Sequence, residues 1–203
     1  YYSHPFPFIS NSIMPNTYII RMADVSDAFG SHGLNTKFDE NIEDNIQRFI
    51  KSLMSIYDVD KKNVVICGAS SGGTGAVYNG LIGGYKTFAI DPFLGNHKYY
   101  GGKDPLYLHS IRTPILETFK RLPDVIDHNL ENQVVISSAK VSEFYPDIKE
   151  LKEALPTIVL CEFDFEKIQK HIDFSGNTVF LSNTLINNLL LDIHITDSDI
   201  NLN

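Results

Sequence analysis

The chain of 203 residues contains no tryptophan and only two cysteines, and it is short of basic residues. Its 17 lysines and arginines stand against 25 aspartates and glutamates, which leaves a formal net charge of -8. General nucleic-acid binding and adhesion to an anionic membrane both need a cationic excess, so we expect neither. A polyanionic substrate would require a local basic patch.

Long hydrophobic runs are also missing. No run approaches the roughly 18 apolar residues of a membrane span, so we expect no transmembrane segment. Cys67 and Cys161 lie in separate apolar runs, where they are expected to be small buried hydrophobes rather than a disulfide or a metal pair. This usage favours a reducing, cytoplasmic compartment, and we expect no bound metal. The chain begins at Tyr1 rather than at methionine, and we expect further strands before it.

One motif stands out, the G-x-S-x-G stretch from Gly68 to Gly72. It follows the apolar run 64–67 and precedes small residues that can start a helix. A serine in such a strand-turn-helix element is held on a strained backbone with its hydroxyl above the sheet. We therefore predict Ser70 as a nucleophile and the backbone N–H of Ser71 as one oxyanion-hole donor. Ser71 is the alternative nucleophile, although its register lacks the first glycine.

Apolar runs alternate with helical patterns along the chain. The expected strands are residues 17–22, 63–67, 87–90, 133–137, 157–161 and 178–181. Helices are expected over 38–56, 74–81 and 148–155. Short apolar strands joined by helices indicate an α/β fold with a mostly parallel sheet covered on both faces. We predict a single α/β-hydrolase-like domain over 1–203, with a cap-like insertion at about 96–130.

The general base should follow the serine in this arrangement. We favour His194, because it lies beyond the last expected strand, where the fold delivers its histidine. Its acidic neighbours also allow a surface histidine with no catalytic part. His171 is the second candidate, although its polar segment 166–170 resembles a solvated helix.

For the acid, Asp164 directly follows an apolar run and so stands at the carboxyl end of a strand. Glu143 and Asp147 are the alternatives. Asp91 also ends a strand, but the proline after it favours a turn former or an Asx cap. The acid would orient the imidazole and stabilise its charged form.

The segment 96–122 carries a local basic excess that is opposite in sign to the whole chain. We predict that Lys98, Lys103 and Arg112 bind an anionic substrate, and a solvated surface is the alternative. Nearby aromatic residues, Phe119 among them, are expected to form an apolar lid that keeps water from an acyl-enzyme. The second oxyanion donor is expected from the segment 3–6.

The elbow segment 66–80, with the upstream segments 21–24 and 30–36, resembles a group of bacterial proteins of the α/β-hydrolase fold. The group comprises capsular-polysaccharide O-acetyltransferases, the meningococcal serogroup A type included, and glycan O-acetyltransferases of the accessory secretion system. The resemblance implies Ser70 as acetyl carrier, His194 as base and Asp164 as its partner. It also implies acetyl-CoA as co-substrate with no permanently bound cofactor, and a capsular polysaccharide as acceptor at the inner face of the membrane.

The residues themselves predict acyl transfer but leave the acceptor open, because water and a sugar hydroxyl use the same nucleophile, base and oxyanion hole. The first hypothesis is therefore an O-acetyltransferase that acts on a capsule glycan. A serine carboxylesterase or deacetylase is the second, and a catalytically silent partner in glycan assembly is the third. The sequence leaves the oligomeric state open.

Overall fold

The computed structural model describes residues 6, 9–24, 30–94, 115–122, 126, 130–140, 144–163 and 165–196. Within them, four parallel strands form one sheet in the order β1-β2-β3-β4, which is also their order along the chain. The strands are β1 (Val65–Ala69), β2 (Lys86–Ile90), β3 (Gln133–Ser137) and β4 (Ile158–Glu162). Because all four run the same way, their carboxyl ends share one edge. The predicted α/β class with a parallel sheet is confirmed.

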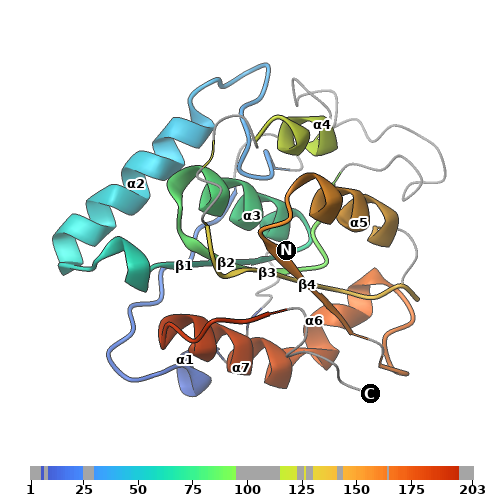
Figure 1. Ribbon diagram of the computed structural model, residues 1–203. Helices are drawn as coiled ribbons and strands as arrows, with labels where there is room; N and C mark the ends of the chain where they lie inside the picture. Colours follow the sequence, from blue (N-terminus) through green and yellow to red (C-terminus); the bar gives the residue numbers. More distant parts are fainter. Residues whose placement is uncertain are drawn as a thin grey trace.

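Helices cover both faces of the sheet (Figure 1). One layer holds α2 (Ile42–Tyr57), α3 (Ser71–Gly83), α4 (Ile115–Lys120) and α5 (Tyr145–Ala154). The other holds α1 (Ile9–Ser12), α6 (Phe174–Asn177) and α7 (Val179–Leu190). Each layer has its own apolar cluster against the sheet. Being covered on both faces, β2 and β3 are buried at every residue.

The predicted elements agree with the structure best in the middle of the chain. Strand β3 has the predicted bounds, and β2 and β4 differ by a residue. Strand β1 starts two residues later than predicted, because Lys61–Asn63 form a 3₁₀ turn before it. In α2 the buried face carries Ile42 and Ile50. Phe38, the first residue of the predicted helix 38–56, lies before α2 and is exposed.

Two predicted strands are wrong. Residues 17–22 have no strand pairing, and most of the segment is exposed. Thr178 is the N-cap of α7, and residues 179–181 are its first residues, where Phe180 faces solvent. The apolar run there is the first turn of a helix that buries Leu185, Ile186 and Leu189 further along.

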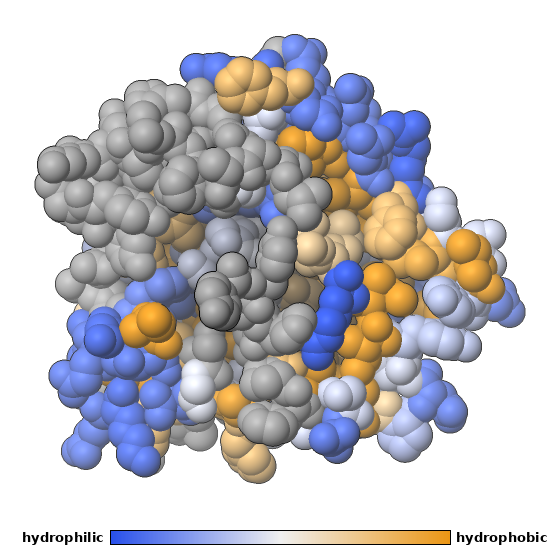
Figure 2. Space-filling view, turned by 180° about the vertical axis from the view of Figure 1, so that it is seen from behind, coloured by the Kyte–Doolittle hydropathy of each residue, from blue (hydrophilic) through white to orange (hydrophobic). Residues whose placement is uncertain are grey.

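Exposed apolar side chains also gather on the rear face of the molecule (Figure 2).

Most of the predicted cap at about 96–130 lies outside the described residues. Helix α4 falls inside that range and belongs to the main core rather than to a lid. Phe119, predicted as a lid residue, is fully buried and contacts the ring of Tyr78 edge-on at 5.6 Å between centroids. Among the described residues, no helix is long and apolar enough to cross a membrane.

Candidate active site

Ser70 occupies the sharp turn between β1 and α3. Its backbone has φ 54° and ψ -123°, a conformation that an L-residue adopts only under strain. Two backbone hydrogen bonds anchor this turn. The Ser70 N–H donates to the Ile90 carbonyl at 2.9 Å, and the Ser70 carbonyl accepts from the Phe93 N–H at 3.2 Å. A Cβ on Gly68 would lie 2.0 Å from the carbonyl oxygen of Gly72, so only glycine fits there. The geometry of the predicted turn is therefore present.

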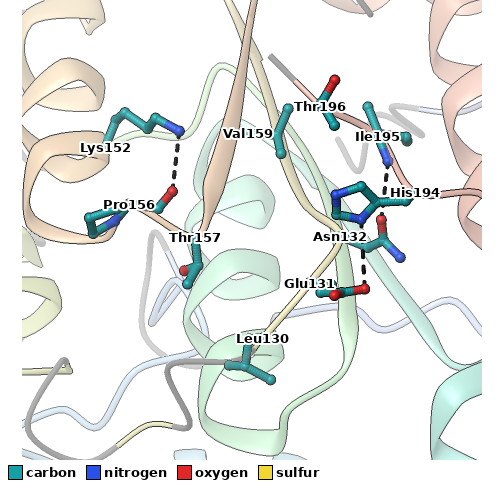
Figure 3. A pocket seen from close by; sticks show the side chains of 10 residues that line it. All are labelled: Leu130, Glu131, Asn132, Lys152, Pro156, Thr157, Val159, His194, Ile195 and Thr196. Carbon is teal, nitrogen blue, oxygen red and sulfur yellow. Dashed lines mark hydrogen bonds and ion pairs between the residues drawn. The ribbon is translucent and has the colours of Figure 1, made fainter. Parts of the chain in front are cut away.

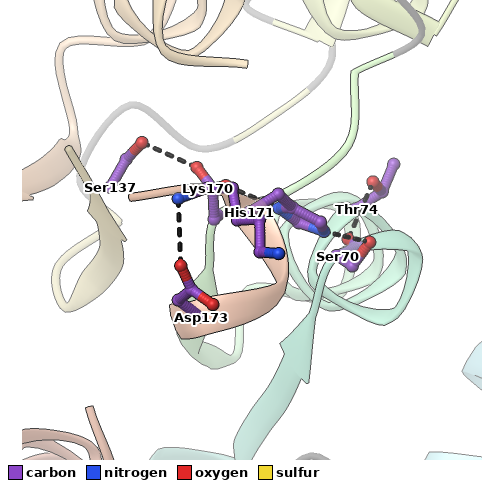
Figure 4. Close-up of polar contacts among 7 residues, drawn as sticks. Ser70, Thr74, Ser137, Lys170, His171 and Asp173 are labelled. Atoms are coloured by element: carbon purple, nitrogen blue, oxygen red, sulfur yellow. Dashed lines mark hydrogen bonds and ion pairs between the residues drawn. The ribbon is translucent and has the colours of Figure 1, made fainter. Parts of the chain in front are cut away.

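His171 faces the Ser70 hydroxyl. It begins the short 3₁₀ turn His171–Asp173, which follows β4, and its Nε2 lies 2.8 Å from Ser70 Oγ (Figure 4). The ring packs edge-on against Phe144, with centroids 4.5 Å apart and planes at 88°. Its side chain is 15 % exposed. This packing fixes the ring plane so that one nitrogen points at the serine.

Asp91 holds the other nitrogen of that ring. Its Oδ2 lies 2.6 Å from His171 Nδ1, and its Oδ1 accepts a hydrogen bond of 2.7 Å from Ser137 Oγ. Asp91 is the first residue after β2, it is fully buried, and its φ is 42°. Its backbone N–H donates to the Ile136 carbonyl at 2.8 Å, which fixes this strained turn to β3. Asp91, judged a turn former from the sequence, does form a turn, and its side chain reaches the histidine.

Topology explains why these side chains meet. Ser70 follows β1, Asp91 follows β2, Ser137 ends β3, and the His171 turn comes after β4. Adjacent parallel strands end at the same edge, so residues from four distant parts of the chain converge there. The arrangement can move a proton from a hydroxyl to an imidazole whose charge is stabilised by a buried carboxylate.

Ser71 is the first residue of α3, as its proposed part in an oxyanion hole requires. The first amides of a helix have no acceptor within it, and the helix dipole favours negative charge there. A Cβ on Gly72 would meet nothing within 4 Å, so open space lies beside this turn. Of the predicted second donor segment 3–6, residues 3–5 lie outside the described part, and the ring of Phe6 packs against Phe88 with centroids 6.2 Å apart.

The predicted pairing of Ser70 with His194 is corrected by the structure. His194 Nδ1 lies 3.6 Å from Glu131 Oε2, and the two side chains are 55 % and 72 % exposed. They line a pocket of about 260 Å³ beside the residues that precede β3 and β4, at the amino edge of the sheet (Figure 3). A strand was expected where α7 begins. Because α7 is a helix, the chain after it returns to the amino edge of the sheet. There the Ile195 N–H donates to Asn132 Oδ1 at 3.4 Å.

The other predicted site residues are less informative. Asp164, Glu143 and the basic residues Lys98, Lys103 and Arg112 lie outside the described residues. Asp147 is half-buried in the first turn of α5. In the described structure Asp91, rather than Asp164, is the carboxylate on the histidine that contacts Ser70. No group of three or more histidine, cysteine or acidic side chains within the described ranges could hold a metal ion.

A tight loop from Gly30 to Leu34 supports α3 just beyond the serine. Gly30, His32 and Gly33 all have positive φ, and Asp24 ties the loop by accepting the Ser31 N–H at 2.6 Å. Asn79 Nδ2 donates to the Gly33 carbonyl at 3.0 Å. Burial lowers the pKa of His32 to about 4, partly offset by the charge of Asp24. The loop thus contributes a neutral, buried histidine next to the Phe93 ring, 5.5 Å away.

The fold of this chain is similar to folds of known structure. No family model and no curated protein matches this sequence. Solved structures do match this chain. One is the capsule O-acetyltransferase of Neisseria meningitidis serogroup A, with a TM-score of 0.60 and 16 % identity over 81 % of this chain and 70 % of that chain.

A second similar structure is a glycosylation-associated protein (Gap123) complex from Streptococcus agalactiae. The TM-score is 0.57 and the identity 13 %, over 79 % of this chain and 34 % of that chain. At such identities the likeness concerns the fold, and it agrees at that level with the resemblance seen in the sequence.

Proposed function

We propose that this protein is a serine-dependent O-acetyltransferase of α/β-hydrolase type that acts on a glycan hydroxyl. Ser70 is the nucleophile, His171 the general base and Asp91 the acid that orients it. The single observation that carries the proposal is the continuous chain of contacts Ser70 Oγ to His171 Nε2 to His171 Nδ1 to Asp91 Oδ2, at 2.8 and 2.6 Å. An idle serine beside a glycine-rich turn would need no such relay.

In the first half-reaction, His171 Nε2 takes the hydroxyl proton of Ser70 as Oγ attacks the acetyl thioester carbonyl. The amide of Ser71, at the start of α3, stabilises the negative oxygen of the tetrahedral intermediate. The carbon–sulfur bond then breaks, and His171 returns the proton to the leaving thiolate. The products are free thiol and acetyl-Ser70.

In the second half-reaction, His171 removes the proton of an acceptor hydroxyl, whose oxygen attacks the acetyl-serine. The ester bond to Ser70 Oγ breaks, and His171 reprotonates that oxygen. The Asp91 carboxylate stabilises the imidazolium that forms in each half. Its complete burial makes that stabilisation stronger than it would be in water.

The fold likeness to a capsule O-acetyltransferase supports a capsular polysaccharide as acceptor. Acetyl-CoA as donor is what the resemblance of the sequence motifs to the O-acetyltransferase group implies. The basic residues Lys98, Lys103 and Arg112 remain candidates for binding the anionic parts of donor or acceptor. With water as the acceptor, the same relay would act as an esterase.

The decisive experiment is to incubate the protein with acetyl-CoA and to measure its intact mass by mass spectrometry. We expect one acetyl group to be added, on Ser70 by peptide mapping, and none in Ser70→Ala. Ser71→Ala is the matched control: it keeps its backbone amide and should still be acetylated. An acetyl group that persists in Ser70→Ala and disappears in Ser71→Ala would move the nucleophile by one residue.

The fate of the acetyl group separates the candidate functions. Transfer to added polysaccharide with little free acetate supports the transferase. Release of acetate at a rate that acceptor does not change would make the protein an esterase. A protein that is never acetylated by acetyl-CoA or by an activated acetate ester would be the silent partner, and the proposal would fall.

A further inference from the structure

We propose that Ser137 is a positioning residue of the relay, which thereby runs over four side chains instead of three. The inference rests on the proposed function, because it assigns Ser137 a part in the same acyl transfer. The Ser137 hydroxyl donates to Asp91 Oδ1 at 2.7 Å, while Asp91 Oδ2 lies 2.6 Å from His171 Nδ1. Each carboxylate oxygen thus has its own partner.

The backbone of Ser137 is held on both sides. It ends β3, pairs with Glu162 of β4, and its carbonyl accepts the Phe163 N–H at 2.8 Å. The residue before it, Ile136, accepts the N–H of Asp91. Figure 4 shows Ser137 on the side of His171 away from Ser70. Its hydroxyl is therefore aimed at Asp91 by the sheet itself.

The chemistry of Asp91 calls for such a donor. Its side chain has no contact with solvent, and a buried carboxylate is costly unless hydrogen bonds satisfy its oxygens. The Ser137 bond satisfies Oδ1 and stops the carboxylate from rotating about its own axis. Without it, Oδ1 would be buried and unsatisfied, and Oδ2 would no longer be fixed toward the imidazole.

The next residue offers a matched control. Ser138 is as buried as Ser137, yet its Oγ accepts the N–H of Lys140 at 3.2 Å and so serves the turn after β3. Ser137→Ala and Ser138→Ala remove the same atom from neighbouring buried positions. A purely structural role for Ser137 would make the two variants alike.

The test follows acetylation of Ser70 by p-nitrophenyl acetate through the burst of p-nitrophenolate. We expect Ser137→Ala to slow acylation by about 10- to 100-fold with an unchanged KM, the loss expected for a hydrogen bond to a charged group. Ser138→Ala should acylate at the wild-type rate, and Ser137→Thr, which keeps the hydroxyl, should recover most of the rate. The low-field proton resonance of His171 Nδ1–H should shift in Ser137→Ala and stay in place in Ser138→Ala.

The reference variant Ser70→Ala keeps the two proposals apart. If Ser70→Ala retains the burst, the proposed function is wrong. If it loses the burst while Ser137→Ala acylates as fast as Ser138→Ala and the histidine resonance does not move, the function stands and the positioning role is overturned. Should Ser137→Ala fold poorly, Ser137→Thr and Ser137→Cys, a weaker donor, provide the comparison of rates.

Discussion

His171 and Asp91 meet at the carboxyl edge of the sheet, whereas His194 and Glu131 meet at the amino edge. Both pairs consist of an imidazole and a carboxylate. The first has a contact of 2.6 Å, a fully buried acid and a ring packed on Phe144, and the second is a loose pair at 3.6 Å in solvent. Charges interact strongly where water is excluded and weakly where it is not. Residue types alone therefore do not make a relay. The edge of the sheet at which the pair lies determines whether the pair is buried and in close contact.

The sharpest way to break this comparison is to remove one histidine at a time. His171→Gln should lower the rate of acetyl transfer by about 10⁴-fold or more, because it removes the base that contacts Ser70 Oγ. His194→Gln should transfer acetyl at the wild-type rate. Saturating acetyl-CoA and circular dichroism of each variant would separate loss of catalysis from loss of fold. The reverse ranking would return the base to His194.

The two acids form the next test. Asp91→Asn keeps the shape of the side chain but removes the charge that holds the imidazole, and we expect a loss of about 10³- to 10⁴-fold in kcat. Glu131→Gln should leave kcat unchanged, since its side chain is mostly in solvent. Steady-state kinetics of both variants would measure this. Equal kcat values would mean that Asp91 is a structural residue only.

A third histidine sharpens the comparison through stability. His32 is buried with its pKa lowered to about 4, while the unfolded chain binds the same proton near 6.5. Between these values the unfolded state holds more protons, so stability falls as the pH falls, by about 3 kcal/mol from pH 7 to pH 4. Urea unfolding at several pH values should show a flatter dependence in His32→Asn, which also suits the positive φ.

His194→Gln is the control for the pH dependence of stability, because it removes a histidine whose side chain is 55 % exposed. An unchanged slope in His32→Asn, together with a reduced one in His194→Gln, would contradict the assignment. The comparison uses differences between pH values, so a constant cost of either substitution cancels.

The smallest effect is expected at the amino edge itself. Lys86 begins β2, is nearly buried, and donates to the Leu189 carbonyl at 2.7 Å where α7 ends. Lys86→Met should cost about 2 kcal/mol of unfolding free energy because that carbonyl loses its charged donor. Activity should not change. A loss of activity without a loss of stability would show that this edge also takes part in function.

The sequence predicted the parts of the site that are local. A glycine-flanked serine between an apolar run and a helix is visible without any tertiary contact, and Ser70 has the expected strained turn. The central strands were equally visible, because buried parallel strands have short, continuous apolar runs.

What depends on tertiary structure was missed. Which strand ends are neighbours decides that Asp91, directly after β2, reaches the site next to β1. Asp164 was favoured because it stands at the end of a strand, and Asp91 stands at the end of a strand as well. The proline after Asp91 led us to interpret it as a turn former only, which was wrong. His194 was favoured because the segment 178–181 was interpreted as a strand. The spacing of Leu185, Ile186 and Leu189 is the helical signal that would have corrected this.

The turn around Ser70 has a last consequence for recognising relatives of this protein. A side chain at Gly68 would collide with the carbonyl of Gly72, and one at Gly75 would lie 2.8 Å from the carbonyl of His32, whereas Gly72 has open space around it. Evolution can therefore replace Gly72 with alanine and gain helix propensity, but it cannot replace Gly68 without moving the nucleophile. A search pattern that demands both flanking glycines would therefore miss any relative that has alanine at position 72. One that demands glycine at 68 and 75, with glycine or alanine at 72, would retain such a relative.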